Sequence, residues 1–243
     1  FIIEAHGRLD GIISSDAVSI NILMLDAIGY FKASNSGAGD NFGFDLEISA
    51  DGSVLAVSSR YERSNATGVN GDQANNALMN AGAVYVFRKQ NNSWVQEAYL
   101  KPSNTDSSDY FGTSITISED GNIIAVGSPG EASNSVGVNS SEGNNSLNNS
   151  GAAYVFEYTG SEWQQTAYIK ATASLQHQFG TSVGLSGDGN TLAVSAVSDN
   201  STGGTVYVLR KQAGNWVHND FISASNGTSG DQFGNRVVLD TDG

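Results

Sequence analysis

Cysteine is absent from this chain, and its 243 residues include only two prolines and three histidines. Without cysteine there is no disulfide framework and no thiol chemistry. The histidines His6, His177 and His218 show no HExxH or other metal-ligand spacing. No apolar run approaches the roughly 18 residues of a membrane-spanning helix, and residues 1–14 lack the basic start and long apolar core of a signal peptide. The sequence therefore predicts no membrane insertion.

Positive charge is also scarce. Eleven Lys and Arg stand against 25 Asp and Glu, which gives a formal net charge of −14. Nucleic-acid binding needs a basic stripe, so we expect no nucleic-acid partner. An acidic, cysteine-free chain rich in Asn, Ser and Gly is typical of secreted bacterial proteins, and we expect an extracellular or cell-surface location.

Glycine, by contrast, is abundant, with 29 residues, and four Phe-Gly pairs divide the chain. They are separated by 69, 68 and 54 residues and occur at Phe42-Gly43, Phe111-Gly112, Phe179-Gly180 and Phe233-Gly234. A repeat period of tens of residues indicates one supersecondary unit that stacks on its neighbours. A residue that recurs in every copy is then more often present for the fold than for chemistry.

Each copy reads as two β-hairpins. After Phe-Gly come an alternating run, an Asp-Gly turn at Asp51, Asp120 or Asp188, and a small apolar run such as VLAVSS. After a variable loop come an aromatic-rich run such as GAVYVFRK, a polar turn, a tryptophan and a last run. Asp-Gly supplies the positive φ angles of a tight hairpin. No window shows sustained helical periodicity, so we predict an all-β chain.

Repeated sheets of four antiparallel strands are typical of β-propeller blades. We predict that Phe-Gly begins the innermost strand, where glycine permits close approach of two backbones and phenylalanine packs between blades. The tryptophans, Trp94, Trp163 and Trp216, are expected to brace adjacent blades.

The Phe-Gly pair, the Asp-Gly turn, the apolar run ending at Gly127-Ser128-Pro129 and GAVYVF resemble the FG-GAP repeat. This repeat forms the blades of the integrin α-subunit propeller and of many bacterial surface proteins, and the tandem bacterial type is the more similar. The resemblance implies a propeller, usually seven-bladed, so we expect about three to four blades of a longer protein, with further blades of the same polypeptide as partners. The expected segments are 1–29 as the end of a preceding blade or upstream domain, 30–243 as FG-GAP blades, and within it 40–104, 109–172, 177–225 and a truncated 231–243.

Integrin-type blades often hold Ca²⁺ in the first hairpin, through several carboxylates around the Asp-Gly turn. The three complete copies keep Asp51, Asp120 and Asp188 but offer Ser49, Ser118 and Ser186, or apolar residues, at most other ligand positions. Calcium needs about 6–8 oxygen ligands. We therefore expect these turns to be metal-free.

The two long loops, residues 60–81 and 129–150, are rich in Asp, Asn and Gly, whereas the third copy shortens the same loop to SDNSTGG. Such loops can wrap Ca²⁺ or can simply be solvated turns, and both readings stay open. The metal ligands to test first are Glu62, Asp72 and Glu131. The loops leave from the same strand junction, so they should lie side by side on one face. The candidate ligand-binding residues are Glu62, Asn65, Asp72, Glu131, Asn134 and Glu142.

Catalytic motifs are weak. Gly180-Thr181-Ser182-Val183-Gly184 fits G-x-S-x-G but lies on a predicted strand instead of a strand–turn–helix elbow. We therefore predict a non-catalytic extracellular adhesion module whose loops bind a protein or glycan ligand. The alternatives are a structural spacer of a large surface protein and a polysaccharide-acting enzyme. An enzyme would need charged residues clustered at the propeller axis, where the inner strands offer Asp45, Glu47 and Arg236.

Overall fold

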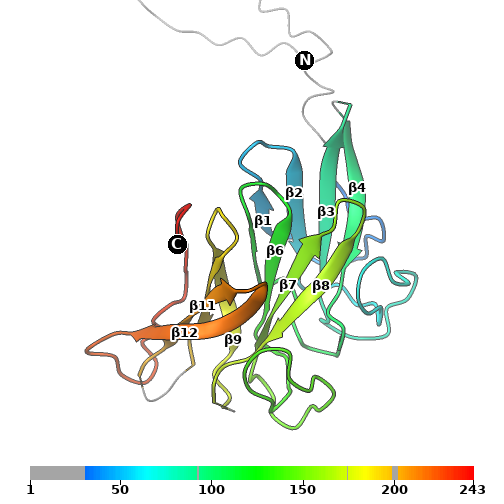
Figure 1. The fold of residues 1–243 in the computed structure, drawn as a ribbon. Coiled ribbons are helices and arrows are strands. Elements are labelled where there is room, and N and C mark those ends of the chain that lie inside the picture. Colours follow the sequence, from blue (N-terminus) through cyan, green and yellow to red (C-terminus); the bar gives the residue numbers. More distant parts are fainter. Residues whose placement is uncertain (1–30, 92, 174, 199–201) are drawn as a thin grey trace, which may run out of the picture. The chain divides into compact units, whose positions relative to one another are not determined.

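A computed structural model of the chain describes residues 31–91, 93–173, 175–198 and 202–243. The chain divides into two compact units, 1–30 and 31–243, and the description below concerns the second. The predicted segment 1–29 lies outside the described residues. In the described part, three four-stranded antiparallel sheets follow one another along the chain (Figure 1).

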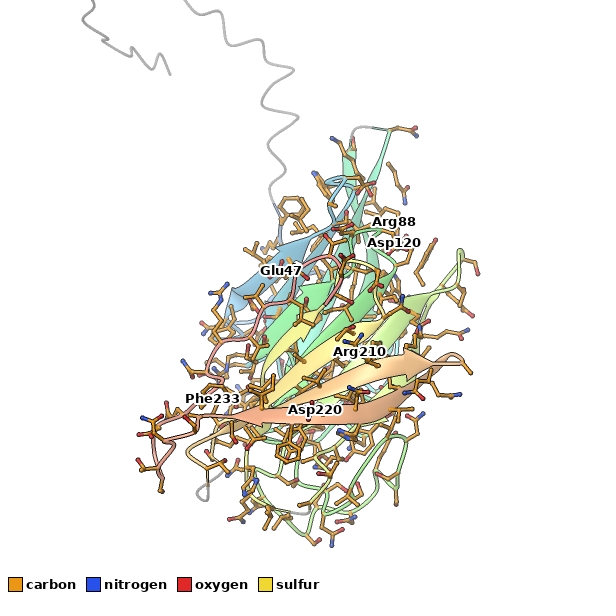
Figure 2. All side chains as sticks on the ribbon, turned by 60° about the vertical axis from the view of Figure 1, so that its left-hand side comes forward. Glu47, Arg88, Asp120, Arg210, Asp220 and Phe233 are labelled. Atoms are coloured by element: carbon orange, nitrogen blue, oxygen red, sulfur yellow. The ribbon has the colours of Figure 1, made fainter. Side chains whose placement is uncertain are left out.

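Each sheet keeps its four strands in chain order. The first contains β1 (Phe42–Ile48), β2 (Val54–Ser59), β3 (Ala83–Gln90) and β4 (Ser93–Leu100). The second contains β5 (Ser114–Ile117), β6 (Ile123–Ser128), β7 (Ala152–Tyr158) and β8 (Trp163–Ile169). The third contains β9 (Phe179–Leu185), β10 (Thr191–Ala196), β11 (Thr205–Gln212) and β12 (Asn215–Ser223). Figure 2 shows β12 as the outer strand of its sheet, with Asp220 on it.

The Asp-Gly turns join the first two strands of each sheet. Gly52 has φ 68°, and the Asp51 carboxylate accepts the Ser49 hydroxyl at 2.6 Å and the Ser53 N–H at 2.9 Å. These hydrogen bonds to the charged form lower the pKa of Asp51 to about 2. The same Ser-to-Asp bond recurs at 2.6 Å in Asp120 and Asp188. The sequence places a tight turn here because serine and aspartate satisfy its backbone locally.

The hydrophobic core lies between successive sheets. One cluster combines Val84 and Leu100 of the first sheet with Phe111 and Tyr154 of the second, and another joins the second and third sheets in the same way. Phe111 is fully buried and packs edge-on against Tyr154, with ring centroids 5.6 Å apart. Packing one sheet on the next through a shared core is how blades hold together, as predicted for Phe-Gly.

Trp163 and Trp216 belong to these inter-sheet clusters. The indole Nε1–H of Trp163 also donates to Glu97 Oε2 of the first sheet, at 2.9 Å. A buried indole that finds its polar partner on the next sheet links the two sheets through both packing and hydrogen bonding. The expectation that the tryptophans brace adjacent blades is thus met at these two positions.

Two glycines let the backbones cross at the junction of the second and third sheets. Gly151 precedes β7, and a Cβ built there would lie 2.1 Å from the Phe179 carbonyl oxygen. Gly180 in turn faces the Ala152 carbonyl oxygen at the same 2.1 Å. Both have positive φ angles, 79° and 88°. Only glycine fits such a crossing, and the glycine before the third strand makes the same close approach to a Phe carbonyl oxygen in all three sheets, at Gly82, Gly151 and Gly204.

Side-chain oxygens link the innermost strands to one another through hydrogen bonds. Asp45 Oδ2 accepts the Ile115 N–H at 2.8 Å, Ser114 Oγ accepts that of Val183 at 3.2 Å, and Ser182 Oγ accepts that of Val237 at 3.0 Å. The hairpin turns are joined as well: the Ala50 N–H donates to Glu119 O and the Glu119 N–H to Gly187 O. These repeated contacts hold β1, β5 and β9 side by side. The all-β fold of partial propeller blades is therefore confirmed.

The described residues contain no helix that is long and apolar enough to cross a bilayer.

Candidate functional site

The first long loop is anchored at its root by a buried ion pair. Lys101, which follows β4, places Nζ 2.9 Å from Glu62 Oε2, and the two side chains are 0% and 1% exposed. The same ammonium group donates to the carbonyl oxygens of Ser64 at 3.1 Å and Gly82 at 2.7 Å. Because Ser64 and Gly82 stand at opposite ends of the loop, one lysine ties both ends to the outer strand.

The other carboxylate oxygen of Glu62 is also occupied. Glu62 Oε1 accepts Asn35 Nδ2 at 2.9 Å and the Ser64 N–H at 3.0 Å. Asn35 Oδ1 in turn accepts the Tyr85 hydroxyl at 2.5 Å. A buried charge is tolerated only when it is paired and its remaining lone pairs are used, and this network meets both conditions.

The second long loop repeats this anchor 69 residues later. Lys170 Nζ lies 2.5 Å from Glu131 Oε2, and both side chains are nearly fully buried. Glu131 Oε1 accepts Asn104 Nδ2 at 3.1 Å and the Tyr168 hydroxyl at 3.0 Å. The third sheet has Ser223 where the others have lysine, and its loop is the short one. The lysine therefore accompanies the long loop and not the blade as such.

Burial dominates the electrostatics of these anchors. Burial lowers the pKa of both Lys101 and Lys170, and the paired glutamate opposes the shift in each case. Asp109 lies near both pairs and is 2% exposed. Burial, Glu131 and Asp106 raise the pKa of Asp109 to about 8, whereas the Asp106 N–H and Lys101 act to lower it. We therefore expect Asp109 to carry a proton near neutral pH in the folded chain.

This proton makes stability depend on pH. Between the unfolded pKa of about 3.9 and the folded pKa of about 8, the folded state binds one more proton. We therefore expect the free energy of unfolding to fall as the pH rises from 5 to 8, by up to about 1.4 kcal/mol per pH unit from this group. Urea unfolding at several pH values measures the slope.

The matched control is Asp109→Asn, whose amide oxygen can still accept the Asp106 N–H, 2.7 Å from Oδ2 in the wild type. We expect the slope of this variant to be flatter than that of the wild type. Equal slopes would show that Asp109 is ionised in the folded chain at neutral pH.

The middle of each long loop extends the sheet edge. Val69 forms an isolated antiparallel bridge with Leu100, and Val138 forms the same bridge with Ile169. Asn70 donates its N–H to Tyr99 O at 2.8 Å and accepts the Tyr99 N–H on its side chain at 2.9 Å. The loops thus cover the end of an outer strand whose edge would otherwise be open, which is one way in which native proteins protect edges.

The calcium hypothesis for Glu62, Asp72 and Glu131 stays a prediction, and the structure shows what each side chain already contacts. Glu62 and Glu131 are each 1% exposed and bonded to lysine, so their oxygens serve the fold, whereas Asp72 is exposed. Asp72 Oδ1 accepts the Ala74 N–H at 2.9 Å within its own turn. The described residues hold no group of three or more His, Cys, Asp or Glu side chains that could bind a metal ion. Of the three residues named as ligands to test first, Asp72 is the one whose side chain is exposed.

The remaining candidates lie on the loop surface. Asn65, Asp72 and Asn134 are exposed, and Glu142 is partly exposed. Each loop is held in shape by an asparagine that accepts a backbone N–H across it: Asn75 Oδ1 bonds the Asn65 N–H at 3.0 Å. Of the six predicted residues, the structure therefore leaves four available to a ligand.

Both loops contact the connection between the first two sheets, residues 101–113. The end of the first loop accepts N–H groups from it: Met79 O from Ser108 at 2.8 Å and Asn80 O from Tyr110 at 3.0 Å. On the second loop, Glu142 accepts the Ser103 hydroxyl, and Asn145 Nδ2 donates to Asp106 Oδ2 at 2.6 Å. The loops thus meet a common segment. No direct bond joins their described tips, so side-by-side placement stays a prediction.

A cavity of about 620 Å³ lies along the innermost strands, between β1, β5, β9 and residues 235–241. Asp45, Glu47 and Arg236 line it, as the enzyme alternative requires (Figure 2 labels Glu47 on β1). Burial and Asp45 raise the pKa of Glu47, and Arg236 opposes the shift. Asp45 is already engaged by the Ile115 N–H at 2.8 Å. Glu47 therefore lines the cavity with a raised pKa, and this is the observation that favours the enzyme alternative.

Sequence reasoning missed the lysine anchors, although a signal was present. Glu62 and Lys101 recur as Glu131 and Lys170 at the same spacing of 69 residues. Opposite charges that recur together in both long-loop copies, with the lysine replaced by Ser223 in the short one, point to a structural pair.

Four-stranded antiparallel sheets that share cores and meet at their innermost strands define blades of the β-propeller class. Within this class, residues 94–156, from β4 to β7, match the FG-GAP repeat family. The resemblance stated from Phe-Gly and GAVYVF is thereby confirmed. An FG-GAP repeat indicates a propeller-type binding or repeat module.

The comparison with solved structures found a candidate 6-phosphogluconolactonase from Bacteroides uniformis. It is 13% identical, with a TM-score of 0.47 over 80% of this chain and 46% of that one. This chain thus spans less than half of that protein's length. No curated protein matched.

Proposed function

We propose that this chain is a non-catalytic binding module that works outside the cell or at the surface of a bacterial cell. Its two long loops present polar tips to a protein or glycan ligand. The observation that carries the proposal is the repeated buried ion pair. Lys101 and Lys170 fix the ends of the two long loops, and the short-loop copy has no such lysine. Rigid roots with exposed tips lower the entropy lost on binding.

The charge and composition support the proposed location. The chain carries a net charge of −14 and no cysteine.

The tips of the long loops present amide groups in particular, since Asn65, Asn76, Asn134 and Asn145 are exposed. Amides both donate and accept hydrogen bonds, which suits hydroxyl-rich or backbone ligands.

The test removes the tips and keeps the anchors. We expect Asn65→Ala, Asp72→Ala and Asn76→Ala, combined with Asn134→Ala and Asn145→Ala, to weaken ligand binding at least tenfold with little change in melting temperature. Binding is measured on a glycan array and by pull-down from surface extracts. The control combines Glu162→Ala and Gln164→Ala, two exposed residues of the second sheet that bond each other at 2.8 Å.

Unchanged binding by the tip variant would place the ligand elsewhere. If the wild type itself binds nothing in either assay, the spacer alternative is favoured. The spacer is supported by the near-identical consecutive sheets, in which the same inter-sheet contacts recur.

A further inference from the structure

Four side chains at the junction of the first two sheets depart from the repeat. They form what we name the arginine–aromatic cluster: Phe44, Arg60, Tyr61 and Tyr110. The second copy has Thr113, Pro129 and Gly130 in place of the first three, and the third has Thr181, Val197 and Ser198. At the position of Tyr110 the other copies have Asn41, Gln178 and Gln232. The fold therefore does not need these four residues, yet they gather in one place.

The cluster is built around the guanidinium group of Arg60. Its Cζ lies 4.5 Å from the ring centroid of Phe44, 5.0 Å from that of Tyr61 and 5.2 Å from that of Tyr110. The two tyrosine rings meet edge-on at 6.1 Å. Phe44 is 42% exposed, and the other three side chains are partly exposed. Three rings thus hold one cation at the protein surface.

The backbone at Tyr110 is strained to allow this. Its φ is 55°, in the left-handed region, where Asn41 has 60° and Gln178 has 54°. Asparagine tolerates this region, whereas a bulky aromatic residue rarely adopts it. Strain of this kind is concentrated at sites of function.

Arg60 differs from the other arginine that stacks on an aromatic ring. Arg88 lies 4.5 Å from the Tyr158 centroid, but its Nε is paired with Glu97 at 2.7 Å. Lys211, which lies over Trp216, is likewise paired with Glu157. Among the described residues no carboxylate forms an ion pair with Arg60, and its Nε is buried without a hydrogen-bond partner.

A small pocket adjoins the cluster. Its volume is about 220 Å³, and its lining includes Tyr61, Arg63 and Met79, which is 58% exposed. Arg63 Nε is also buried without a hydrogen-bond partner. Of the acids near Arg63, Glu62 pairs with Lys101, and Asp40 accepts the Gly37 N–H at 2.7 Å on one oxygen, while its other oxygen is buried without a hydrogen-bond partner. Arg60 and Arg63, each with an Nε group that has no hydrogen-bond partner, therefore lie beside partly exposed aromatic side chains.

We propose that the arginine–aromatic cluster, together with Arg63, binds a carboxylated sugar unit of an acidic polysaccharide. The C–H face of a sugar ring packs on Tyr61 or Tyr110, and its carboxylate accepts hydrogen bonds from the Nη groups at the guanidinium ends of Arg60 and Arg63. Guanidinium groups suit carboxylates because their forked donors match both oxygens. This inference rests on the proposed function as a binding module but uses different residues from the loop tips.

Partly exposed aromatic rings beside a pocket favour a sugar ring over an acidic peptide, which would bring charge without an apolar face. The net charge of −14 opposes long-range attraction of any polyanion. At physiological ionic strength the screening length is about 8 Å, so the local arginines dominate at contact.

The test is calorimetric titration of the full chain with tetragalacturonate at 0.15 M salt and with EDTA present. We expect saturable binding that Arg60→Gln and Tyr110→Gln each weaken at least tenfold. Tyr110→Gln installs the residue that two other copies carry at the same φ, so its melting temperature should equal or exceed that of the wild type. The control Arg88→Gln should bind like the wild type.

Three ligand outcomes overturn the proposal: no binding by the wild type, equal binding of the methyl-esterified tetramer, or equal binding of tetraglutamate. A drop in the melting temperature of Tyr110→Gln without loss of affinity would assign the cluster to the fold. The loop-tip variant separates this inference from the proposed function. If the wild type ignores tetragalacturonate but still shows tip-dependent binding on the array or in pull-down, only the cluster's role fails.

Discussion

Replacing Lys101 by methionine is expected to lower the free energy of unfolding by about 3–5 kcal/mol. The variant leaves the Glu62 carboxylate, which is 1% exposed, without its cation. It also removes the donor that serves the Ser64 and Gly82 carbonyl oxygens at the two ends of the loop. Removing one partner of a buried pair is costly because the other charge stays desolvated. Urea unfolding of the two proteins measures the difference.

The control for this prediction is the double variant Glu62→Leu with Lys101→Met. It removes both charges, so we expect it to recover a large part of the lost stability, with Ser64 O and Gly82 O still short of a donor. A double-mutant cycle then gives the coupling between the two side chains. If Lys101→Met alone costs less than about 1 kcal/mol, the pair behaves like a solvent-exposed salt bridge and does not anchor the loop.

Substituting alanine for Gly180 is expected to destabilise the chain by at least about 3 kcal/mol. Its Cβ would lie 2.1 Å from the Ala152 carbonyl oxygen and 3.0 Å from the Ser128 nitrogen. Both are backbone atoms of the neighbouring sheet, so they move only if the junction between the two sheets opens. The measurement is again the free energy of unfolding.

The first copy provides a matched control at the same motif position. Gly43 has a φ of 86°, against 88° at Gly180, but a Cβ there would meet nothing within 4 Å. Gly43→Ala should therefore cost only about 1 kcal/mol, the conformational part. Equal losses at both glycines would mean that the positive φ, and not the crossing of two backbones, explains the repeated glycine.

Much of the fold could be predicted because its determinants are local or repeated. Asp51-Gly52 fixes a hairpin through bonds to Ser49 and Ser53, all within five residues. Phe111 and Gly112 recur in every copy, so the burial of Phe111 at the junction between sheets follows from the repeat. Local turns and repeated apolar positions indicate the same architecture, so the fold could be predicted from this sequence.

The candidate site was harder to predict because its determinants are distant in sequence. Glu62 stands in a polar loop, and only its contact with Lys101, 39 residues away, shows that its charge serves the fold. The arginine–aromatic cluster brings Phe44, Arg60 and Tyr110 together from three segments. Polar and aromatic residues in loops look alike in sequence whether they are buried, paired or free.

The central claim is that repeated residues stabilise the fold, whereas residues found in one copy alone serve binding. Thermal unfolding of Lys101→Met and Tyr110→Gln tests this claim most directly. Lys101 recurs as Lys170, whereas Tyr110 replaces the Asn or Gln of the other copies. We predict that Lys101→Met lowers the melting temperature by roughly 10 °C. Tyr110→Gln should leave the melting temperature unchanged or raise it. A lower melting temperature for Tyr110→Gln than for Lys101→Met would contradict this division between fold and function.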